Sequence, residues 1–250
     1  MVRPCDCRAR ARTCGREEAA ATPTVEGDGG GAGDRRPIAA RGSRGANALA
    51  GWLIARRASP DAISLAGMGC GLAAGACLAG VWWAGPGWGS RALWLLAALL
   101  VQGRLLCNLL DGMVAVGRGV ASATGELFNE VPDRVSDAAV LVGLGAAAGG
   151  DWALGWAAAL AAMATAYARA VGRGLGRPSD FRGPMAKQHR MAAVTAVAVW
   201  CGLAPWAWGA GSGLPALALW AILVLSLATA ARRLAGVASG LRASGGGRAR

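Results

Sequence analysis

Residues 107–137 read CNLLDGMVAVGRGVASATGELFNEVPDRVSD and lie between two long apolar runs. This stretch holds acidic and amide side chains at short intervals, which are Asn108, Asp111, Glu126, Asn129, Glu130, Asp133 and Asp137. Ionisable side chains inside membrane segments cost free energy, and they usually face a cavity or one another. The stretch therefore predicts a polar site where two apolar helices meet.

The composition around this stretch is that of a membrane protein. The chain has 250 residues, of which 54% are hydrophobic, and its net charge is +12 with Lys187 as its only lysine. An arginine-rich balance suits either nucleic acid or anionic lipid. Because the arginines flank apolar runs, we interpret them as lipid-facing and expect no nucleic-acid partner.

The order of apolar segments predicts an all-α integral membrane protein with six transmembrane helices preceded by an interfacial amphipathic helix. We expect spans near 61–83, 91–115, 131–149, 152–171, 189–209 and 214–233, each about 20 residues as a bilayer requires. Residues 1–45 would form a disordered arginine-rich leader, 46–60 the interfacial helix ended by Pro60, 61–235 the membrane catalytic domain and 236–250 a disordered basic tail.

The basic residues predict the orientation of these spans. The turns at 84–90 and 205–215 carry no charge, whereas the leader, the 116–134 loop and the 172–190 loop are rich in arginine. Positively charged loops stay on the cytoplasmic side. We therefore expect a multi-pass protein of the cell membrane, with both termini and the polar site cytoplasmic.

The spacing of the polar residues brings two helix faces together. Arg104, Asn108, Asp111 and Ala115 share one face of the second span, and Asp133 and Asp137 form a stripe on the third with Asn129 or Glu130. Oxygen donors of this kind suit Mg²⁺ or Mn²⁺, and the absence of cysteine and histidine from these two stripes disfavours zinc. Two structural alternatives stand beside this metal site. Arg104 can pair with Asp111 or Asp133 to join the helices, and Asn129 can be the N-cap of the third span with Pro132 in its first turn.

The same residues resemble the signature of the CDP-alcohol phosphatidyltransferase family, D-x-x-D-G-x-x-A-R-x8-G-x-x-x-D-x-x-x-D. Every spacing of that signature is kept, with matches at Asp111, Gly112, Ala115, Gly125 and Asp133 and differences at Asn108, Val116 and Asn129. Weaker similarity lies in Ser59–Ser64, which resembles the start of the family's first membrane helix, and in Gly183–Arg190, which resembles its basic segment before the fifth. The resemblance covers roughly residues 47–235.

This resemblance implies an enzyme of phospholipid biosynthesis. In that family two divalent ions bridge the diphosphate of a CDP-activated lipid such as CDP-diacylglycerol, an alcohol attacks the lipid-side phosphorus, and CMP leaves. By position, Asp111 would bind metal, Asn108 and Asn129 would stand where the family has metal ligands, and Asp133 would be the general base or a second-metal ligand. The small residues Gly112, Ala115 and Gly125 would let the nucleotide approach closely. The resemblance also suggests a homodimer.

Because of the departures from the signature, other residues would have to supply the missing negative charge and the missing arginine. Two carboxamides remove negative charge from a metal site whose affinity depends on ligand charge, and Glu126, Glu130 or Asp137 could restore that charge. The signature has an arginine where this chain has Val116, and Arg118 or Arg104 could take over its role. Lys187 and Arg190 could bind a phosphate on the acceptor, or could serve only topology and attraction to anionic lipid. The alternative function is a catalytically inactive membrane scaffold on the same helices.

Overall fold

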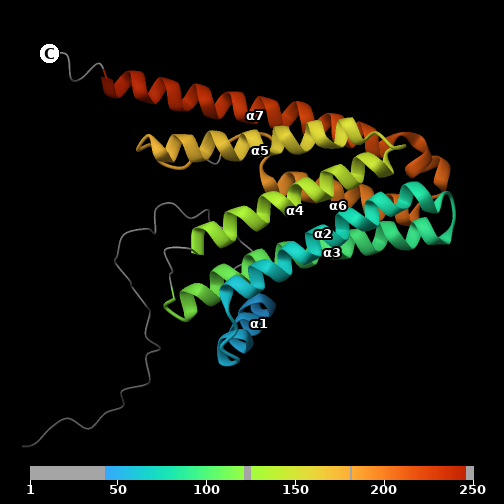
Figure 1. Cartoon of the computed structure of the whole chain (residues 1–250), viewed down its shortest axis with the longest axis horizontal. Helices are drawn as coiled ribbons and strands as arrows, with labels where there is room; N and C mark the ends of the chain where they lie inside the picture. Colours follow the sequence, from blue (N-terminus) through green and yellow to red (C-terminus); the bar gives the residue numbers. More distant parts are fainter. Residues whose placement is uncertain (1–42, 121–124, 181, 246–250) are drawn as a thin grey trace, which may run out of the picture. The chain divides into compact units, whose positions relative to one another are not determined.

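The computed structural model describes residues 43–120, 125–180 and 182–245. These residues form seven α-helices and two short 3₁₀ helices, without a strand among them, which confirms the all-α prediction (Figure 1). The helices are α1 Arg44–Ala55, α2 Pro60–Ala84, α3 Trp88–Gly117, α4 Gly125–Ala147, α5 Trp152–Gly174, α6 Lys187–Leu203 and α7 Leu214–Gly245, with η3 Trp206–Trp208 and η4 Ala210–Ser212 between the last two. Most of the predicted leader, residues 1–42, lies outside the described residues.

Helix α1 has a side-chain cap at its start and a cation–π contact near its end. The hydroxyl of Ser43 accepts a hydrogen bond from the Ala46 amide at 3.3 Å, which satisfies one of the free amides at the helix start. The guanidinium of Arg56 lies 4.8 Å from the centre of the Trp52 ring, a cation–π contact. Pro60 does not end this helix as the sequence had suggested. It is the first residue of α2, where proline is tolerated because the first amides of a helix have no partner within the helix.

Four helices are long and apolar enough to cross a bilayer, namely α2, α3, α5 and α7. The other two predicted spans correspond to α4, which carries the acidic residues, and to α6, which has 17 residues. The four apolar helices have the length and composition of membrane spans. Helix α7 continues to Gly245, past the predicted end of the sixth span and into the residues expected to form the tail.

Glycines let α2 approach its neighbours closely. A Cβ atom built on Gly71 would lie 2.5 Å from the Ser136 Cβ atom, and one on Gly75 would lie 2.5 Å from the Ala139 carbonyl oxygen, both on α4. A Cβ on Gly67 would lie 2.9 Å from that of Cys107 on α3. Gly67, Gly71 and Gly75 thus form a stripe of small residues, four positions apart, that holds α2 against the two helices that carry the polar site.

Helix α4 begins earlier than the sequence had indicated. It starts at Gly125, so Asn129 lies inside the helix and is not its N-cap, and Pro132 is also an interior residue. Pro132 has no amide to donate, and its own carbonyl accepts a hydrogen bond of 2.6 Å from the Ser136 hydroxyl. Asp133 and Asp137 therefore lie well inside α4, where both pair with Arg104 of α3.

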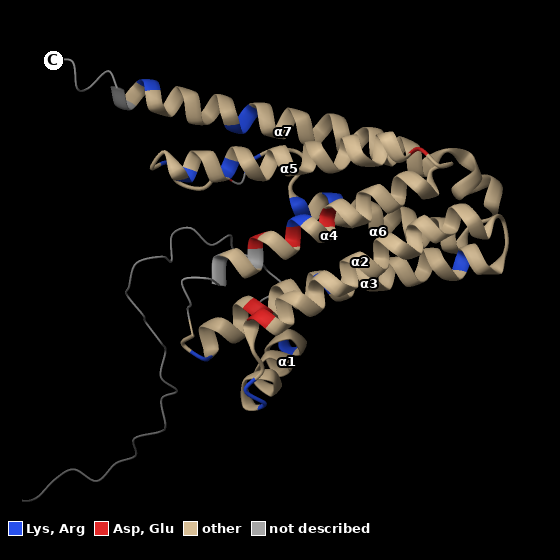
Figure 2. Ribbon diagram, viewed as in Figure 1, with Lys and Arg blue, Asp and Glu red and all other residues tan. Residues whose placement is uncertain are grey.

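Charged side chains are distributed unevenly along the helices. Figure 2 shows the acidic residues of α3 and α4 and most basic residues of α5, α6 and α7 toward one end of the bundle. The turns at the other end hold only Arg91 and Asp151 near them. The polar site therefore belongs to the charged end, as the loop composition had predicted.

Candidate active site

One face of α3 supplies the first part of the site. Asp111 is 4% exposed, and its two carboxylate oxygens accept hydrogen bonds from the Ser64 hydroxyl at 2.6 Å and from the Gly112 amide at 2.5 Å. Ser64 comes from α2, whose glycine stripe brings it within reach. Among the described residues, no lysine or arginine lies within ion-pair distance of Asp111. Asp111 is thus a buried carboxylate held by neutral donors.

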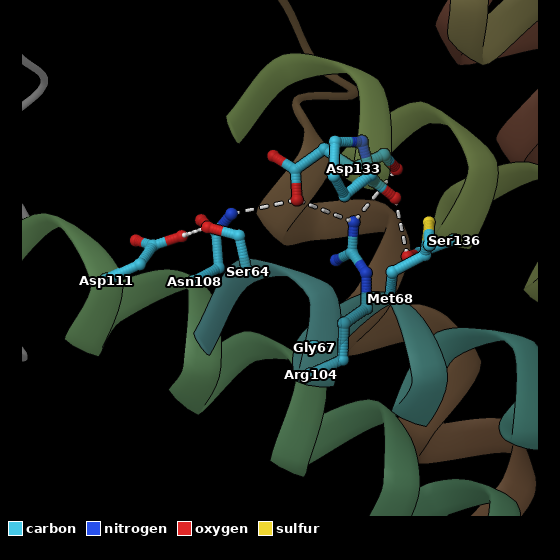
Figure 3. Close-up of a pocket in the computed structure, with 9 residues that line it drawn as sticks. Ser64, Gly67, Met68, Arg104, Asn108, Asp111, Asp133 and Ser136 are labelled. Carbon is cyan, nitrogen blue, oxygen red and sulfur yellow. Dashed lines mark hydrogen bonds and ion pairs between the residues drawn. The ribbon is translucent and has the colours of Figure 1, made fainter. Parts of the chain in front are cut away.

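Asp133 on α4 is surrounded by three donors from two other helices. Its Oδ1 atom accepts from Asn108 Nδ2 at 2.8 Å and from Arg104 Nη2 at 3.2 Å, while Oδ2 contacts the ammonium group of Lys187. Asn108 and Arg104 lie on α3, and Lys187 is the first residue of α6. The predicted convergence of Asn108, Asp111 and Asp133 is therefore present (Figure 3).

Arg104 forms the ion pair with Asp133 that the sequence offered as a structural link between the two helices. It is 1% exposed and pairs with Asp133 and with Asp137 Oδ1 at 2.5 Å, but not with Asp111. Its Nε and Nη1 atoms are buried without a hydrogen-bond partner among the described residues. Arg104 therefore joins α3 to α4 and still has donors to offer.

Asp137 and Arg190 continue this ion network into the core. Arg190, also 1% exposed, lies 3.4 Å from Asp137 Oδ2 and donates to the Met185 carbonyl at 3.1 Å. Its Nη1 atom also reaches the Thr165 hydroxyl at 3.4 Å. Arg190, predicted to bind an acceptor phosphate, is in the structure a buried partner of Asp137 that links α6 to α4 and α5.

Glu130, considered as a source of compensating charge, faces another way. Its carboxylate contacts Arg134 one turn along α4 and Arg169 on α5. These contacts tie α4 to α5 at the charged end of the helices. Asp137, the other candidate, is shared between Arg104 and Arg190. Both carboxylates are thus already engaged by arginines.

The remaining predicted residues lie beside the site or outside the described atoms. Gly112 and Ala115 are half-buried on the same side of α3 as Asp111, and Val116 is 60% exposed. Arg118 donates to the Ala58 carbonyl at 2.6 Å and to that of Arg57 at 3.2 Å, which ties the end of α3 to the α1–α2 connection. The side chains of Glu126 and Asn129 lie outside the described part of the structure, and Gly125 is described only as the first residue of α4.

A small cavity lies between Asp111 and Asp133. Its volume is about 10 Å³, and it is lined by Ser64, Met68, Arg104, Asn108, Asp111 and Asp133 among others (Figure 3). A space of about 10–15 Å³ holds one water molecule. The cavity is therefore large enough for a single small ion or water between the two carboxylates.

The loop between α5 and α6 holds a separate, exposed ion pair. Asp180 Oδ1 accepts from the Arg182 amide at 2.9 Å and from its Nε atom at 3.1 Å. The side-chain hydrogen bond from Arg182 lowers the pKa of the Asp180 carboxyl, against the opposing effect of desolvation. Neither residue lines the cavity between Asp111 and Asp133.

Comparison with solved structures identifies the fold. The chain is similar to phosphatidylinositol phosphate synthase from Mycobacterium tuberculosis with CDP-DAG bound, with a TM-score of 0.62, 21% identity, and coverage of 78% of this chain and 94% of that one. The same enzyme in complex with manganese and citrate gives a TM-score of 0.62 and 20% identity, covering 77% of this chain and 88% of that one. The chain has the fold of phosphatidylinositol phosphate synthase. The resemblance to CDP-alcohol phosphatidyltransferases is thereby confirmed at the level of the fold.

Comparisons with protein-family models and with curated proteins give no match to this chain. The structural likeness to phosphatidylinositol phosphate synthase thus stands beside a signature in which Asn108, Val116 and Asn129 depart from the family pattern.

The described donors of this phosphatidylinositol phosphate synthase fold can be tested for their fit to divalent ions. Asp111 fits, because it is a buried carboxylate without a described cationic partner, beside the Asn108 carboxamide and a cavity of one-ion size. Asp133 does not fit in the same way, because Lys187, Arg104 and Asn108 already engage both its oxygens. No group of three acidic, cysteine or histidine side chains that could hold a metal occurs in the described residues. The donors suit one ion at Asp111 and not a second at Asp133.

Sequence reasoning missed some residues of the site. Ser64 was noted only within the segment that resembles the start of the first membrane helix, although it holds Asp111 directly. The contact of Lys187 with Asp133 spans 54 positions, and no local spacing indicates it. Arg134 and Arg169 were likewise not linked to Glu130. A helical-wheel reading of Glu130 and Arg134, four residues apart, could have found the first of these pairs.

Proposed function

We propose that this protein is a CDP-alcohol phosphatidyltransferase of phospholipid biosynthesis. It transfers the phosphatidyl group of a CDP-activated lipid, such as CDP-diacylglycerol, to an alcohol and releases CMP. The observation that carries the proposal is the convergence of Asn108, Asp111 and Asp133 beside one cavity, in the signature register, on a fold shared with a lipid-synthesising transferase.

The site offers distinct surfaces for the two halves of the nucleotide lipid. Asp111 and Asp133 lie at the charged end of the helices, and α2 and α3 continue from there as apolar spans that suit acyl chains. Gly112 and Ala115 are small residues, so a nucleotide can approach α3 closely near Asp111. Gly125 would do the same at the start of α4.

The reaction forms one phosphorus–oxygen bond and breaks another. The hydroxyl oxygen of the acceptor attacks the phosphorus bearing diacylglycerol, and the bond from that phosphorus to the CMP oxygen breaks. The acceptor proton passes to the Asp133 carboxylate, and CMP leaves with the bonding electron pair. Before it can take the proton, Asp133 has to release one of the donors that hold it in the structure.

A divalent ion, Mg²⁺ or Mn²⁺, would be held by Asp111 with the Asn108 carboxamide oxygen, and Asn129 would stand nearby as in the family signature. When bound, it supplies neutralisation of negative charge on the diphosphate. The buried Arg104 contributes a fixed positive charge beside the same cavity. Ser64 orients the Asp111 carboxylate through its hydrogen bond.

The proposal includes the placement of the protein. It would be a multi-pass protein of the cell membrane with six spans, α2 to α7, and α1 lying at the interface. The charged end and both termini would face the cytoplasm, following the distribution of arginine. The protein would act as a homodimer, as the family resemblance suggests.

The test is release of radiolabelled CMP by protein reconstituted in lipid nanodiscs, with CDP-diacylglycerol, Mn²⁺ or Mg²⁺ and a panel of free and phosphorylated alcohols. Asp111→Ala and Asp133→Ala should each lower the rate at least about 100-fold. Asp180→Asn is the matched control, because Asp180 is an acidic residue of the α5–α6 loop, and it should keep the parental rate. Full activity of Asp133→Ala would contradict the proposed role.

A second candidate function is an inactive scaffold on the same fold. The observation that favours it is the full set of donors on Asp133, which makes a closed ion network between α3, α4 and α6. A scaffold would give no CMP with any acceptor, and Asp133→Ala would then affect only the free energy of unfolding.

A further inference from the structure

Among the side chains that the structure describes, the ion network of the site is electrically balanced by protein groups alone. Three carboxylates, Asp111, Asp133 and Asp137, lie together with three cationic side chains, Arg104, Lys187 and Arg190. Arg104 and Arg190 are each 1% exposed, and Lys187 is 21% exposed at its side chain. Charges taken out of water at this depth are stable only when they are paired.

Lys187 and Arg104 stand on the side of the cavity where Asp133 lies. Lys187 contacts Asp133 Oδ2 and Arg104 Nη2 lies 3.2 Å from Oδ1, so positive charge adjoins both oxygens. Asp111, on the other side, is held only by Ser64 and the Gly112 amide. The site is therefore asymmetric, with one carboxylate already matched by cations and one not.

The charge of the substrate limits how many further cations the site can accept. The diphosphate of a CDP-lipid carries about two negative charges, which one divalent ion balances when the protein network is already neutral. A second divalent ion would leave an excess positive charge in a buried site and would have to displace Lys187 from Asp133. The cavity of about 10 Å³ also has room for only one small ion.

We propose that the ammonium group of Lys187, supported by Arg104, takes the place of one of the two divalent ions that the family resemblance implies. The site then binds a single divalent ion, at Asp111. Lys187 reaches the diphosphate from the Asp133 side, and the buried Nη1 atom of Arg104, without a partner among the described residues, points from the same side. This inference rests on the proposed function and assigns Lys187 to the diphosphate in place of the acceptor.

The experiment counts bound ions directly. Protein in nanodiscs containing CDP-diacylglycerol is titrated with Mn²⁺, and bound and free Mn²⁺ are separated by electron paramagnetic resonance. We expect one bound Mn²⁺ per chain in the parent and in Lys187→Arg, which keeps the cation. In Lys187→Ala, Asp133 is released, so a second Mn²⁺ should bind, and the Mn²⁺ concentration for half-maximal CMP release should rise about tenfold with a steeper dependence. Arg182→Ala, a nearby exposed arginine, is the control and should bind one ion.

The outcomes separate this inference from the proposed function. Two bound ions in the parent, or one ion in Lys187→Ala with unchanged Mn²⁺ dependence, would overturn the role of Lys187 while CMP release would still support the transferase. CMP release in chelator without bound Mn²⁺ would overturn the one-ion site and leave the transferase in place. One bound ion without CMP release from any acceptor would support the ion count and overturn the proposed function. Circular dichroism and gel filtration of each variant check that it is folded.

Discussion

The pairing of Arg104 with two acids predicts a large and non-additive effect on stability. Arg104→Met removes a side chain that is 1% exposed and that contacts Asp133 and Asp137 while it leaves most of the volume filled. Breaking a buried ion pair by removing one partner costs about 3–5 kcal/mol, because a buried charge loses its compensation. Here Lys187 remains on Asp133 and Arg190 remains 3.4 Å from Asp137. We therefore expect a loss near the lower end, about 3 kcal/mol.

The double variant Arg104→Met/Asp137→Asn tests the cause of that loss. The double variant removes both Arg104 and the charge of Asp137, whose Oδ1 atom lies 2.5 Å from Arg104 Nη2. Asp137→Asn should therefore cost less stability when Arg104 is absent than when it is present. The coupling free energy should be at least about 1 kcal/mol. Reversible unfolding in mixed micelles, followed by far-ultraviolet circular dichroism, gives all four free energies of unfolding. The reasoning would be refuted if the free energy of unfolding of Arg104→Met lay within about 1 kcal/mol of the parent value, or if the effects of the two substitutions were strictly additive.

Three further predictions follow from other contacts. Asn108→Asp replaces a donor that lies 2.8 Å from Asp133 Oδ1 with a second carboxylate, so the melting temperature should fall in chelator and recover in millimolar Mn²⁺, and a fall that Mn²⁺ leaves unchanged would contradict this. Gly75→Leu places a side chain where even a Cβ would lie 2.5 Å from the Ala139 carbonyl, and it should cost about 1–3 kcal/mol or more of stability in the same unfolding assay, whereas Gly69→Leu, with open space around it, should cost less. The lowered pKa of Asp180 means that its contact with Arg182 is present above the ordinary carboxyl range and is lost as pH falls through the lowered value; carboxyl NMR should place the midpoint below 3.8 in the parent and nearer to 3.8 in Arg182→Ala.

Local pattern explains the parts of the fold that the sequence could predict. The apolar runs gave α2, α3, α5 and α7, and the repeat of Gly67, Gly71 and Gly75 gave the close packing of α2. The start of α4 could not be predicted well, because Pro132 and the charges before it are typical of a helix boundary. Glu130 is tolerated inside this helix because Arg134 and Arg169 pair with its carboxylate.

The residues that form the site could be predicted, but the ion pairs between them could not. Helical spacing placed Asn108 and Asp111 on one face of the second span and Asp133 and Asp137 on one stripe of the third, since it depends only on residues a few positions apart. Which cation meets which carboxylate depends on how α6 docks, and Lys187 is far from Asp133 in sequence. For the same reason Arg190, expected to bind phosphate, lies against Asp137 in the core.

The cross-helix pairing of α4 has a consequence for biosynthesis. By itself α4 is too polar to partition into lipid, since Asp133 and Asp137 lie in it together with Glu130. The partners of Asp133 and Asp137 come from α3, made earlier, and from α6, made later, so these two acids acquire their full set of counter-charges only after Lys187 and Arg190 have left the ribosome. In the proposed six-span arrangement, stable insertion of α4 would therefore wait for the downstream half of the chain, because nascent chains that end before α6 lack the cations that α6 supplies.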